Sequence, residues 1–345
     1  RLEEVFFNRL VHPLTIPDMG LRSLRLRERF DVVHVHAHPA RIGGLGRIPL
    51  VMSEGSSSAV YIRDYLNWGE DRLARAYART RRIYRALGIH DRLLNLDRVA
   101  RAYVFSRWAR DVNIRWGADP EKIDVVYPGF PTPPPVERSR RETFTFLFVG
   151  TDFERKGGFE VVEAFGAVAA ERREARLLIV SSDPGMPNPD RVHHSWVTES
   201  KRQAGLMRLG ALERQGLVER HPLLGQERLF EEMYPRADAF VMPSHAEGFG
   251  FTNVEALSFG LPVISSRVGA IPEVVEHERS GLLVAAGDVG TLAEAMLRLA
   301  SERSLAVRMG EAARAAFLER FTLERFRAEV GRVYRDAMEG RCGAS

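Results

Sequence analysis

The chain has 345 residues, of which 45% are hydrophobic and 28% are charged, and its formal net charge at pH 7 is +4. No run of about eighteen apolar residues occurs, which argues against a membrane-spanning helix. The single cysteine, Cys342, excludes a disulfide framework and a thiolate metal site, and suits a reducing cytoplasm.

Positive charge is concentrated in the first part of the chain. Residues 1–140 carry 24 Lys and Arg against 16 Asp and Glu, whereas the remainder carries 26 against 30. A basic front half could face anionic lipid, an acidic acceptor or nucleic acid, or it could be a solvated surface rich in arginine. Both interpretations stay open, although we expect no nucleic-acid partner.

The first 130 residues alternate strand-like apolar runs with segments of helical period. The segment 70–87 is a predicted helix with Leu73, Tyr77, Tyr84 and Leu87 on one face and arginines over the rest. The other predicted elements of this half are a helix over 107–117 and strands over 30–37, 48–53, 100–106 and 122–129. A proline-rich stretch over 131–142 then predicts an interdomain linker.

The same alternation begins again at residue 143. The predicted strands are 143–150, 175–182, 238–244 and 261–266, and the predicted helices are 157–173, 226–237, 252–260, 290–302 and 304–340. This pattern is typical of parallel sheets with crossover helices. We expect an α/β fold in which two Rossmann-like, doubly wound domains face each other across a cleft. The expected domains are 1–130 and 143–320, with a helix in 321–345 packing back on the first domain.

The segment "FVGTDFERKGG" (148–158) combines a strand end with two adjacent cations. A buried strand runs into Gly150, and Arg155 and Lys156 lie just before a predicted helix N-terminus. Free N–H groups and the helix dipole favour an anion there, so two cations would make a diphosphate site. An ordinary exposed basic loop is the alternative.

The segment "EGFGFTNVE" (247–255) places two carboxylates around a glycine-containing loop that opens a helix. Thr252 is a plausible N-cap, and Glu255 three residues later would complete a capping box. This interpretation leaves Glu247 without a structural role. Because Glu255 lies in the first helical turn, both carboxylates could border one pocket.

These motifs resemble the family 4 retaining glycosyltransferases of the GT-B fold, also called glycosyl transferases group 1. The resemblance runs from about 144 to 330 through "FVGTDFERKGG", "HAEGFGFTNVEALSFGLPV", "IPEVV" and "FLERFTLERFRAEV". It implies that Glu247 contacts the transferred sugar, that Glu255 holds the nucleotide ribose, and that Arg155 and Lys156 stabilise the departing diphosphate. The further nucleotide-sugar contacts that it implies involve Gly150, Gly250, Phe251 and Thr252. No Asp-x-Asp pair occurs, so we expect neither a metal nor another cofactor.

The first half resembles the family less closely. "FDVVHVHAHP" and "IPLVMSEGSSS" resemble strands whose following loops line the acceptor side, with His36 as a candidate and Glu54 where the family often has histidine. His36 could equally be a packed or solvated strand residue. The family's opening strand and glycine-rich loop are absent from this sequence, which indicates either a fragment or a degenerate domain. The basic helix 70–87 could dock on a membrane, or its arginines could simply be solvated.

The leading hypothesis is a retaining, metal-independent glycosyltransferase that moves a hexose or a related sugar from a nucleotide-diphosphate sugar to an unknown acceptor. The acceptor could be a saccharide, a lipid-linked molecule or a small molecule. We expect it to act in polysaccharide or glycolipid biosynthesis, in the cytoplasm or at the inner face of the membrane. A catalytically impaired sugar-nucleotide binder or partner subunit is the alternative, because the glycine-rich loop is missing. An epimerase is disfavoured by the two glutamates, and a pyridoxal-dependent phosphorylase by the lack of a suitable lysine.

Overall fold

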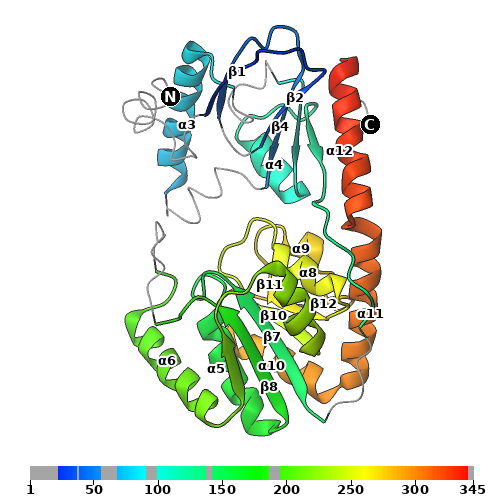
Figure 1. Cartoon of the computed structure of the whole chain (residues 1–345). Helices are drawn as coiled ribbons and strands as arrows, with labels where there is room; N and C mark the ends of the chain where they lie inside the picture. Colours follow the sequence, from blue (N-terminus) through cyan, green and yellow to red (C-terminus); the bar gives the residue numbers. More distant parts are fainter. Residues whose placement is uncertain are drawn as a thin grey trace. The chain divides into compact units, whose positions relative to one another are not determined.

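The chain divides into two compact units. Unit 1 comprises Arg1–Gly129 and Glu324–Ser345, and unit 2 comprises Phe130–Leu323. Each unit contains parallel β-structure with accompanying helices, which confirms the predicted α/β class (Figure 1). The computed structural model describes residues 22–36, 39–55, 68–90, 99–136, 142–185 and 195–340.

Unit 2 is built on a six-stranded sheet in the order β12-β11-β10-β7-β8-β9, with all neighbours parallel. Its strands are β7 Phe144–Gly150, β8 Ala175–Ser181, β9 Val218–His221, β10 Ala239–Met242, β11 Val263–Ser266 and β12 Gly281–Val284. Chain order runs outward from β7 in both directions. The strand order therefore reverses between β7 and β10, and the carboxyl ends of these two strands form the topological switch point at which doubly wound sheets bind ligands.

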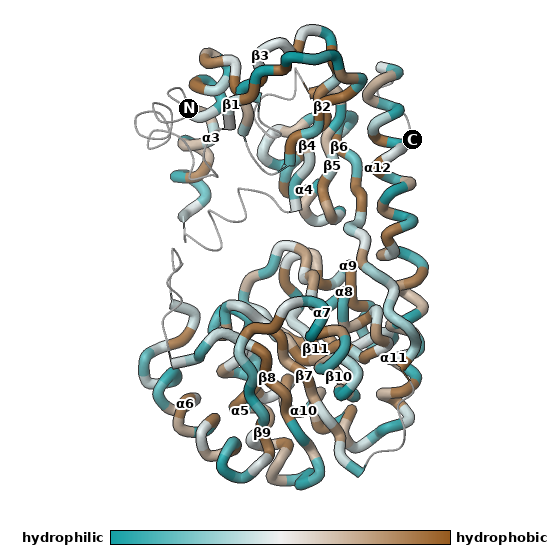
Figure 2. Tube along the Cα trace, viewed as in Figure 1, coloured by the Kyte–Doolittle hydropathy of each residue, from teal (hydrophilic) through white to brown (hydrophobic). Residues whose placement is uncertain are grey.

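The strands of unit 2 have apolar sequences because their aromatic side chains form its core. Phe144, Phe146, Phe148 and Phe240 are at most 2% exposed, and burial of such side chains is a main driving force for folding. Figure 2 shows hydrophobic residues gathered in β7, β8 and β10. The α-helices of this unit are α5 Gly158–Glu171, α6 Glu199–Arg214, α7 Gln226–Arg228, α8 Phe251–Ser258, α9 Ile271–Val274, α10 Val289–Ser301 and α11 Arg303–Arg320.

Unit 1 contains a four-stranded parallel sheet in the order β2-β4-β5-β6 and a parallel pair, β1-β3. The C-terminal helix, α12, packs Val333 and Ala337 against Val51, Tyr103 and Val126, so it shares a core with this sheet. The elements are β1 Arg22–Arg25, β2 Val33–His36, β3 Ala40–Gly43, β4 Leu50–Glu54, β5 Arg101–Val104, β6 Ile123–Val125, α3 Glu70–Leu87, α4 Arg107–Arg115 and α12 Leu323–Glu339.

Two helical predictions have different outcomes. The segment 304–340 is confirmed as helical, with a break at residues 321–322 between α11 and α12, where the chain pairs with Phe130, whose N–H donates to the Phe321 carbonyl at 2.8 Å. The segment 226–237 begins as α7 but continues as a π turn, η5 (Leu229–Met233), and a 3-10 turn, η6 (Tyr234–Arg236). The sequence also gave no indication of α6, β9, β12 or the β1-β3 pair.

The helix over 70–87 is confirmed as α3, but its buried face is not quite the predicted one. Leu73, Tyr77 and Tyr84 are buried, whereas Leu87 is 41% exposed at the helix end. In the predicted linker, residues 131–136 form no regular element. Residues 137–141 of that linker and Cys342 lie outside the described part of the chain. So does the segment before residue 22, to which the prediction of a missing opening strand refers.

Candidate functional site

Residues from the two predicted motifs meet at the switch point of unit 2. Arg155 and Lys156 lie between β7 and α5, and Glu247 lies between β10 and α8. Lys156 Nζ donates a hydrogen bond to Glu247 Oε2, and Arg155 Nη1 lies 3.9 Å from the same oxygen. The parallel pairing of β7 with β10 therefore gathers charges that are 91 positions apart in the sequence.

This ion pair is largely removed from water. The side chains of Lys156 and Glu247 are each 12% exposed. Burial would raise the pKa of the Glu247 carboxyl, but the positive charges of Lys156 and Arg155 and the hydrogen bonds outweigh burial, so its pKa lies below the ordinary value. Burial lowers the pKa of the Lys156 ammonium, although Glu247 opposes that shift. The site thus holds a carboxylate in its ionised form beside two basic groups.

Arg155 is anchored to the loop that carries Glu247. Its Nη1 donates to the Ala246 carbonyl at 2.9 Å, and its Nε lies 3.4 Å from Asp152 Oδ2. Asp152 Oδ1 also accepts from the Arg155 backbone N–H at 3.2 Å. These contacts fix the direction of the guanidinium, and sequence reasoning missed the role of Asp152 because it considered only the cations of this loop.

Two close backbone approaches require glycine. Gly157 has φ +80°, and a Cβ there would lie 2.3 Å from the Pro243 carbonyl oxygen at the end of β10. A Cβ on Gly269 would lie 1.8 Å from the Glu247 carbonyl oxygen. The loops after β7 and β11 can therefore press against the Glu247 segment. Gly150 lies beside the aliphatic part of Lys156, with 3.0 Å between its would-be Cβ and Lys156 Cγ.

The N-terminus of α8 lies in the loop of the two glutamates. Gly250 is its N-cap, with φ 85°, and no side chain caps it. The first N–H groups of a helix lack partners within the helix and favour an anion. Phe251 is 46% exposed, and Thr252 Oγ1 lies 3.2 Å from Met242 Sδ. The three predicted backbone contacts, at Gly250, Phe251 and Thr252, thus occupy one helix end.

The capping-box interpretation of Glu255 is wrong. The helix begins at Phe251 rather than after Thr252, so Thr252 is already helical. The Glu255 carboxylate instead accepts from Tyr234 Oη at 2.8 Å and from Gln226 Nε2 at 3.1 Å. Burial raises the pKa of this carboxyl despite both hydrogen bonds. Glu255 therefore belongs to a polar cluster that sequence reasoning missed, because its two donors precede it by more than twenty residues.

The sequence also did not reveal the role of Glu154. Its buried carboxylate accepts from the N–H groups of Trp196 and Val197 and from Ser195 Oγ, and it pairs with Arg202. This holds the Trp196 ring over His245, with ring centroids 5.5 Å apart and planes inclined by 16°. Glu154 thus fixes the segment that carries Trp196, which lies beside the Glu247 loop.

The two acceptor-side candidates lie at the carboxyl ends of neighbouring strands of unit 1. His36 ends β2 and Glu54 ends β4. His36 Nδ1 and His34 Nε2 hydrogen-bond with Ser53 Oγ at 2.7 and 2.8 Å, and His34 Nδ1 lies 2.8 Å from Tyr334 Oη. Glu54 is 6% exposed. The structure thus places both candidates at the carboxyl edge of a parallel sheet, with His36 in a hydrogen-bonded cluster that includes Ser53 and Glu54 buried at the end of the next strand.

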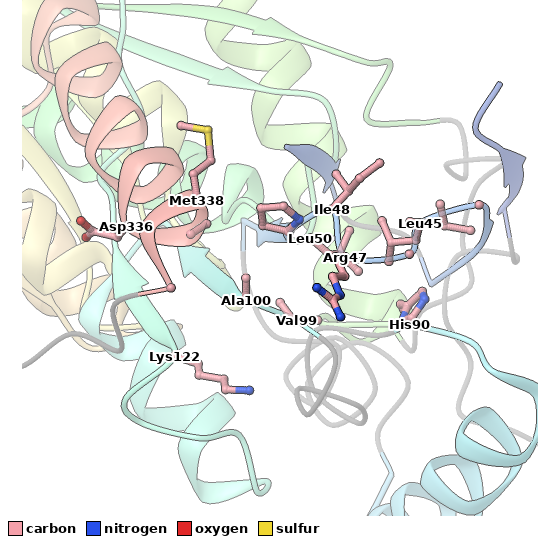
Figure 3. Close-up of a pocket in the computed structure, with 16 residues that line it drawn as sticks. Leu45, Arg47, Ile48, Leu50, His90, Val99, Ala100, Lys122, Asp336 and Met338 are labelled. Atoms are coloured by element: carbon pink, nitrogen blue, oxygen red, sulfur yellow. The ribbon is translucent and has the colours of Figure 1, made fainter. Parts of the chain in front are cut away.

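A cavity of about 800 Å³ in unit 1 lies elsewhere (Figure 3). Leu50 and Lys122 line it, and these residues lie at the start of β4 and directly before β6. The cavity is therefore at the amino ends of the strands, opposite to the edge where such sheets bind ligands. No predicted site residue lines it.

The described ranges contain neither a cluster of metal-ligating side chains nor a helix suited to span a membrane. No group of three or more His, Cys, Asp or Glu side chains in these ranges is arranged to hold a metal ion. Among the helices of the described ranges, none combines the length and the apolar character that a bilayer crossing requires.

Comparison with known sequences identifies relatives of both halves. The family described as "Glycosyl transferases group 1" matches residues 132–316, and "Glycosyltransferase Family 4" matches residues 4–133. D-inositol 3-phosphate glycosyltransferase of Streptomyces scabiei is 32% identical over 237 residues, covering 64% of this chain and 50% of that protein. N-acetyl-alpha-D-glucosaminyl L-malate synthase of Bacillus anthracis is 28% identical over 179 residues, covering 52% and 42%. The chain thus spans about half the length of these curated relatives.

Comparison with solved structures confirms the GT-B fold class. Anabaena Alr3699/HepE, in complex with UDP and glucose, superposes with a TM-score of 0.60 at 16% identity, covering 84% of this chain and 72% of that one. Sucrose-phosphate synthase from Thermosynechococcus elongatus gives a TM-score of 0.61 at 23% identity, covering 85% and 69%.

Proposed function

Because the chain belongs to the glycosyl transferases group 1 family and has the GT-B fold, we propose that it transfers a sugar from a nucleotide-diphosphate sugar to an acceptor. The observation that carries this proposal is the buried contact of Lys156 with Glu247, beside Arg155, at the switch point of unit 2. Such an arrangement matches the opposite charges that develop when a glycosyl phosphate bond breaks.

The charge changes of this reaction can be assigned to the residues of the site. As the bond between the anomeric carbon and the phosphate oxygen breaks, negative charge grows on the diphosphate and positive charge on the sugar ring. Arg155, Lys156 and the N-terminus of α8 would stabilise the diphosphate, since fixed donors and charges act strongly in a site with little water. Glu247 would accept hydrogen bonds from the sugar hydroxyls and stabilise the positively charged ring. Glu255 would hold the ribose.

Two finer features are part of the same proposal. We propose that the anomeric configuration is retained, as in the family that the motifs resemble, and that Arg155 and Lys156 neutralise the diphosphate without a metal. Analysis of the product by NMR would show the anomeric configuration. Turnover in the presence of EDTA should equal turnover in its absence, and a requirement for added divalent cations would refute metal independence.

The donor and the acceptor are proposed from different observations. The solved relative from Anabaena holds UDP and glucose, so UDP-glucose is the first donor to test. We propose His36 and Glu54 of unit 1 as acceptor-side residues, because they end neighbouring parallel strands. A saccharide or lipid-linked acceptor of polysaccharide or glycolipid synthesis fits this class of enzyme.

The exposed arginines of α3 would provide peripheral contact with an anionic membrane from the cytoplasm. Binding to vesicles at low and high salt would test this contact, because salt screens attraction between exposed charges.

Turnover of a donor panel tests the proposal. Wild type should release nucleoside diphosphate from at least one of the UDP-, GDP- and ADP-sugars, and Glu247→Gln should reduce the rate by about 100-fold or more. Glu163→Gln is a matched control, because Glu163 is exposed on α5. Tight nucleotide binding without release, unaffected by Glu247→Gln, would instead indicate a non-catalytic sugar-nucleotide binder.

A further inference from the structure

The carboxylate of Glu255 is held on both of its oxygens. Tyr234 Oη donates to Oε2 at 2.8 Å, and Gln226 Nε2 donates to Oε1 at 3.1 Å. Tyr234 is 0% exposed, whereas Gln226 is exposed. The carboxylate therefore lies between a deeply buried donor and one that solvent can reach. Each oxygen can accept more than one hydrogen bond, so both retain acceptor capacity for a ligand.

A change of helix type brings the two donors to one face. Gln226 and Tyr234 are eight positions apart, and in a regular α-helix eight residues turn about 80° beyond two full turns. The intervening Leu229–Met233 forms a π turn, which takes about one residue more than an α turn. One α turn and one π turn together take about eight residues, so both side chains can reach Glu255.

The packing around Tyr234 fixes the direction of its hydroxyl. Its ring stacks on Phe259, with centroids 4.9 Å apart and planes inclined by 7°. The Phe230 ring is nearly perpendicular to it, with centroids 5.7 Å apart, and the Phe240 ring is tilted by 32°, with centroids 6.2 Å apart. Burial and the Glu255 carboxylate raise the pKa of the Tyr234 phenol well above its usual value. The phenol therefore remains a donor across the working pH range, and the Glu255 carboxylate is its acceptor.

We propose that Tyr234 and Gln226 are positioning residues, which orient Glu255 so that it accepts hydrogen bonds from the two ribose hydroxyls of the donor. This inference rests on the proposed function and extends it to specificity. A ribonucleotide presents both hydroxyls to the carboxylate, whereas a 2′-deoxyribonucleotide leaves one acceptor oxygen without its ligand partner. The trio of Tyr234, Gln226 and Glu255 thus selects ribonucleotides over deoxyribonucleotides.

Calorimetric titration with paired nucleotides tests this inference. Wild type is titrated with UDP, GDP and ADP, and whichever binds most tightly is compared with its 2′-deoxy form. A hydrogen bond to a charged group should favour the ribonucleotide by at least about 10-fold. In Tyr234→Phe and in Gln226→Ala this preference should fall to less than about 3-fold, while affinity for the deoxynucleotide changes little. A purely structural role would weaken both nucleotides equally.

Controls separate this inference from the proposed function. Tyr84→Phe removes a buried phenol of α3 in unit 1 and should leave the preference unchanged. If Glu255→Gln abolishes the preference but Tyr234→Phe and Gln226→Ala both retain it, the positioning inference is overturned and the ribose role of Glu255 stands. If Glu255→Gln retains the preference, or if wild type binds none of the three nucleotides, the proposed nucleotide site itself is refuted and the inference with it.

Discussion

Replacing Lys156 with methionine should strongly destabilise unit 2. The substitution removes the ammonium that compensates the Glu247 carboxylate, and with both side chains 12% exposed little water can replace it. Removing one partner of a buried ion pair costs about 3–5 kcal/mol. Arg155, 3.9 Å from the same carboxylate oxygen, offsets part of that cost. We therefore expect a loss of about 3 kcal/mol, which for a unit of this size lowers the melting temperature by about 6–12 °C.

Differential scanning calorimetry of matched variants measures this effect. Lys156→Met is compared with Lys201→Met, which removes an exposed lysine of α6 and should melt like wild type. The double variant Lys156→Met/Glu247→Met replaces the whole pair with apolar side chains and should recover most of the lost stability. Equal melting temperatures for Lys156→Met and Lys201→Met would refute the reasoning. So would a double variant that melts no higher than Lys156→Met.

The difference in melting temperature between wild type and Lys156→Met should depend on pH. The pKa of Glu247 is lowered in the folded protein, so its contribution to stability is present above the unfolded-state pKa of about 4.3 and is lost as pH falls through the folded-state pKa. In Lys156→Met the main compensating charge is gone, and burial should raise that pKa instead. The difference in melting temperature between wild type and variant should therefore shrink as pH falls, first above about pH 4.3, where the variant carboxylate becomes protonated, and then below it, where wild type loses its ion pair. A constant difference down to pH 3 would contradict this.

Three further predictions concern neighbouring positions. Burial lowers the pKa of Lys156. Turnover should therefore fall as pH rises through a value below the ordinary lysine pKa of about 10.4. Lys156→Arg should move this alkaline limb of the pH–rate profile to higher pH or abolish it. Gly157→Ala would place a Cβ 2.3 Å from the Pro243 carbonyl oxygen and should cost about 1–3 kcal/mol. Gly216→Ala, at φ +68° but with nothing within 4 Å, should cost less in the same melting experiment. The raised pKa of Glu255 means that its contribution is fully present below about pH 4.3 and is lost as pH rises through the folded-state pKa. Glu255→Gln should therefore melt no lower than wild type at pH 7 while nucleotide affinity falls, and a lower melting temperature with unchanged affinity would favour a purely structural glutamate.

The sequence predicted the parts of the fold that local patterns determine. Runs such as "TFTFLFVG" (143–150) identify buried strands, because only a strand covered on both faces accommodates so many large apolar side chains. The glycines and acids of "EGFGFTNVE" likewise marked a loop at a strand end. Short strands with alternating charge, such as β9 with its exposed Glu219 and Arg220, carry no such signal and were missed.

The pairing of side chains within the site could not be predicted in the same way. Lys156 and Glu247 meet only because β10 pairs with β7, and a strand order is not readable from local periodicity. The partners of Glu255 depend on a π turn, which one extra residue creates without any distinctive composition. A capping box was therefore the nearest local explanation for Glu255, and it was wrong because Gly250 begins the helix earlier.

The most direct test of the proposed donor site compares a nucleoside diphosphate with its nucleoside by titration calorimetry, because the acceptor need not be known. UDP, GDP and ADP are each paired with uridine, guanosine and adenosine. The charges of Arg155 and Lys156 predict that one diphosphate binds at least about 100-fold more tightly than its nucleoside, and that Lys156→Met removes most of this difference while Lys201→Met retains it. Equal affinity for diphosphate and nucleoside, or a difference that Lys156→Met leaves intact, would contradict a diphosphate site at the ends of β7 and β10.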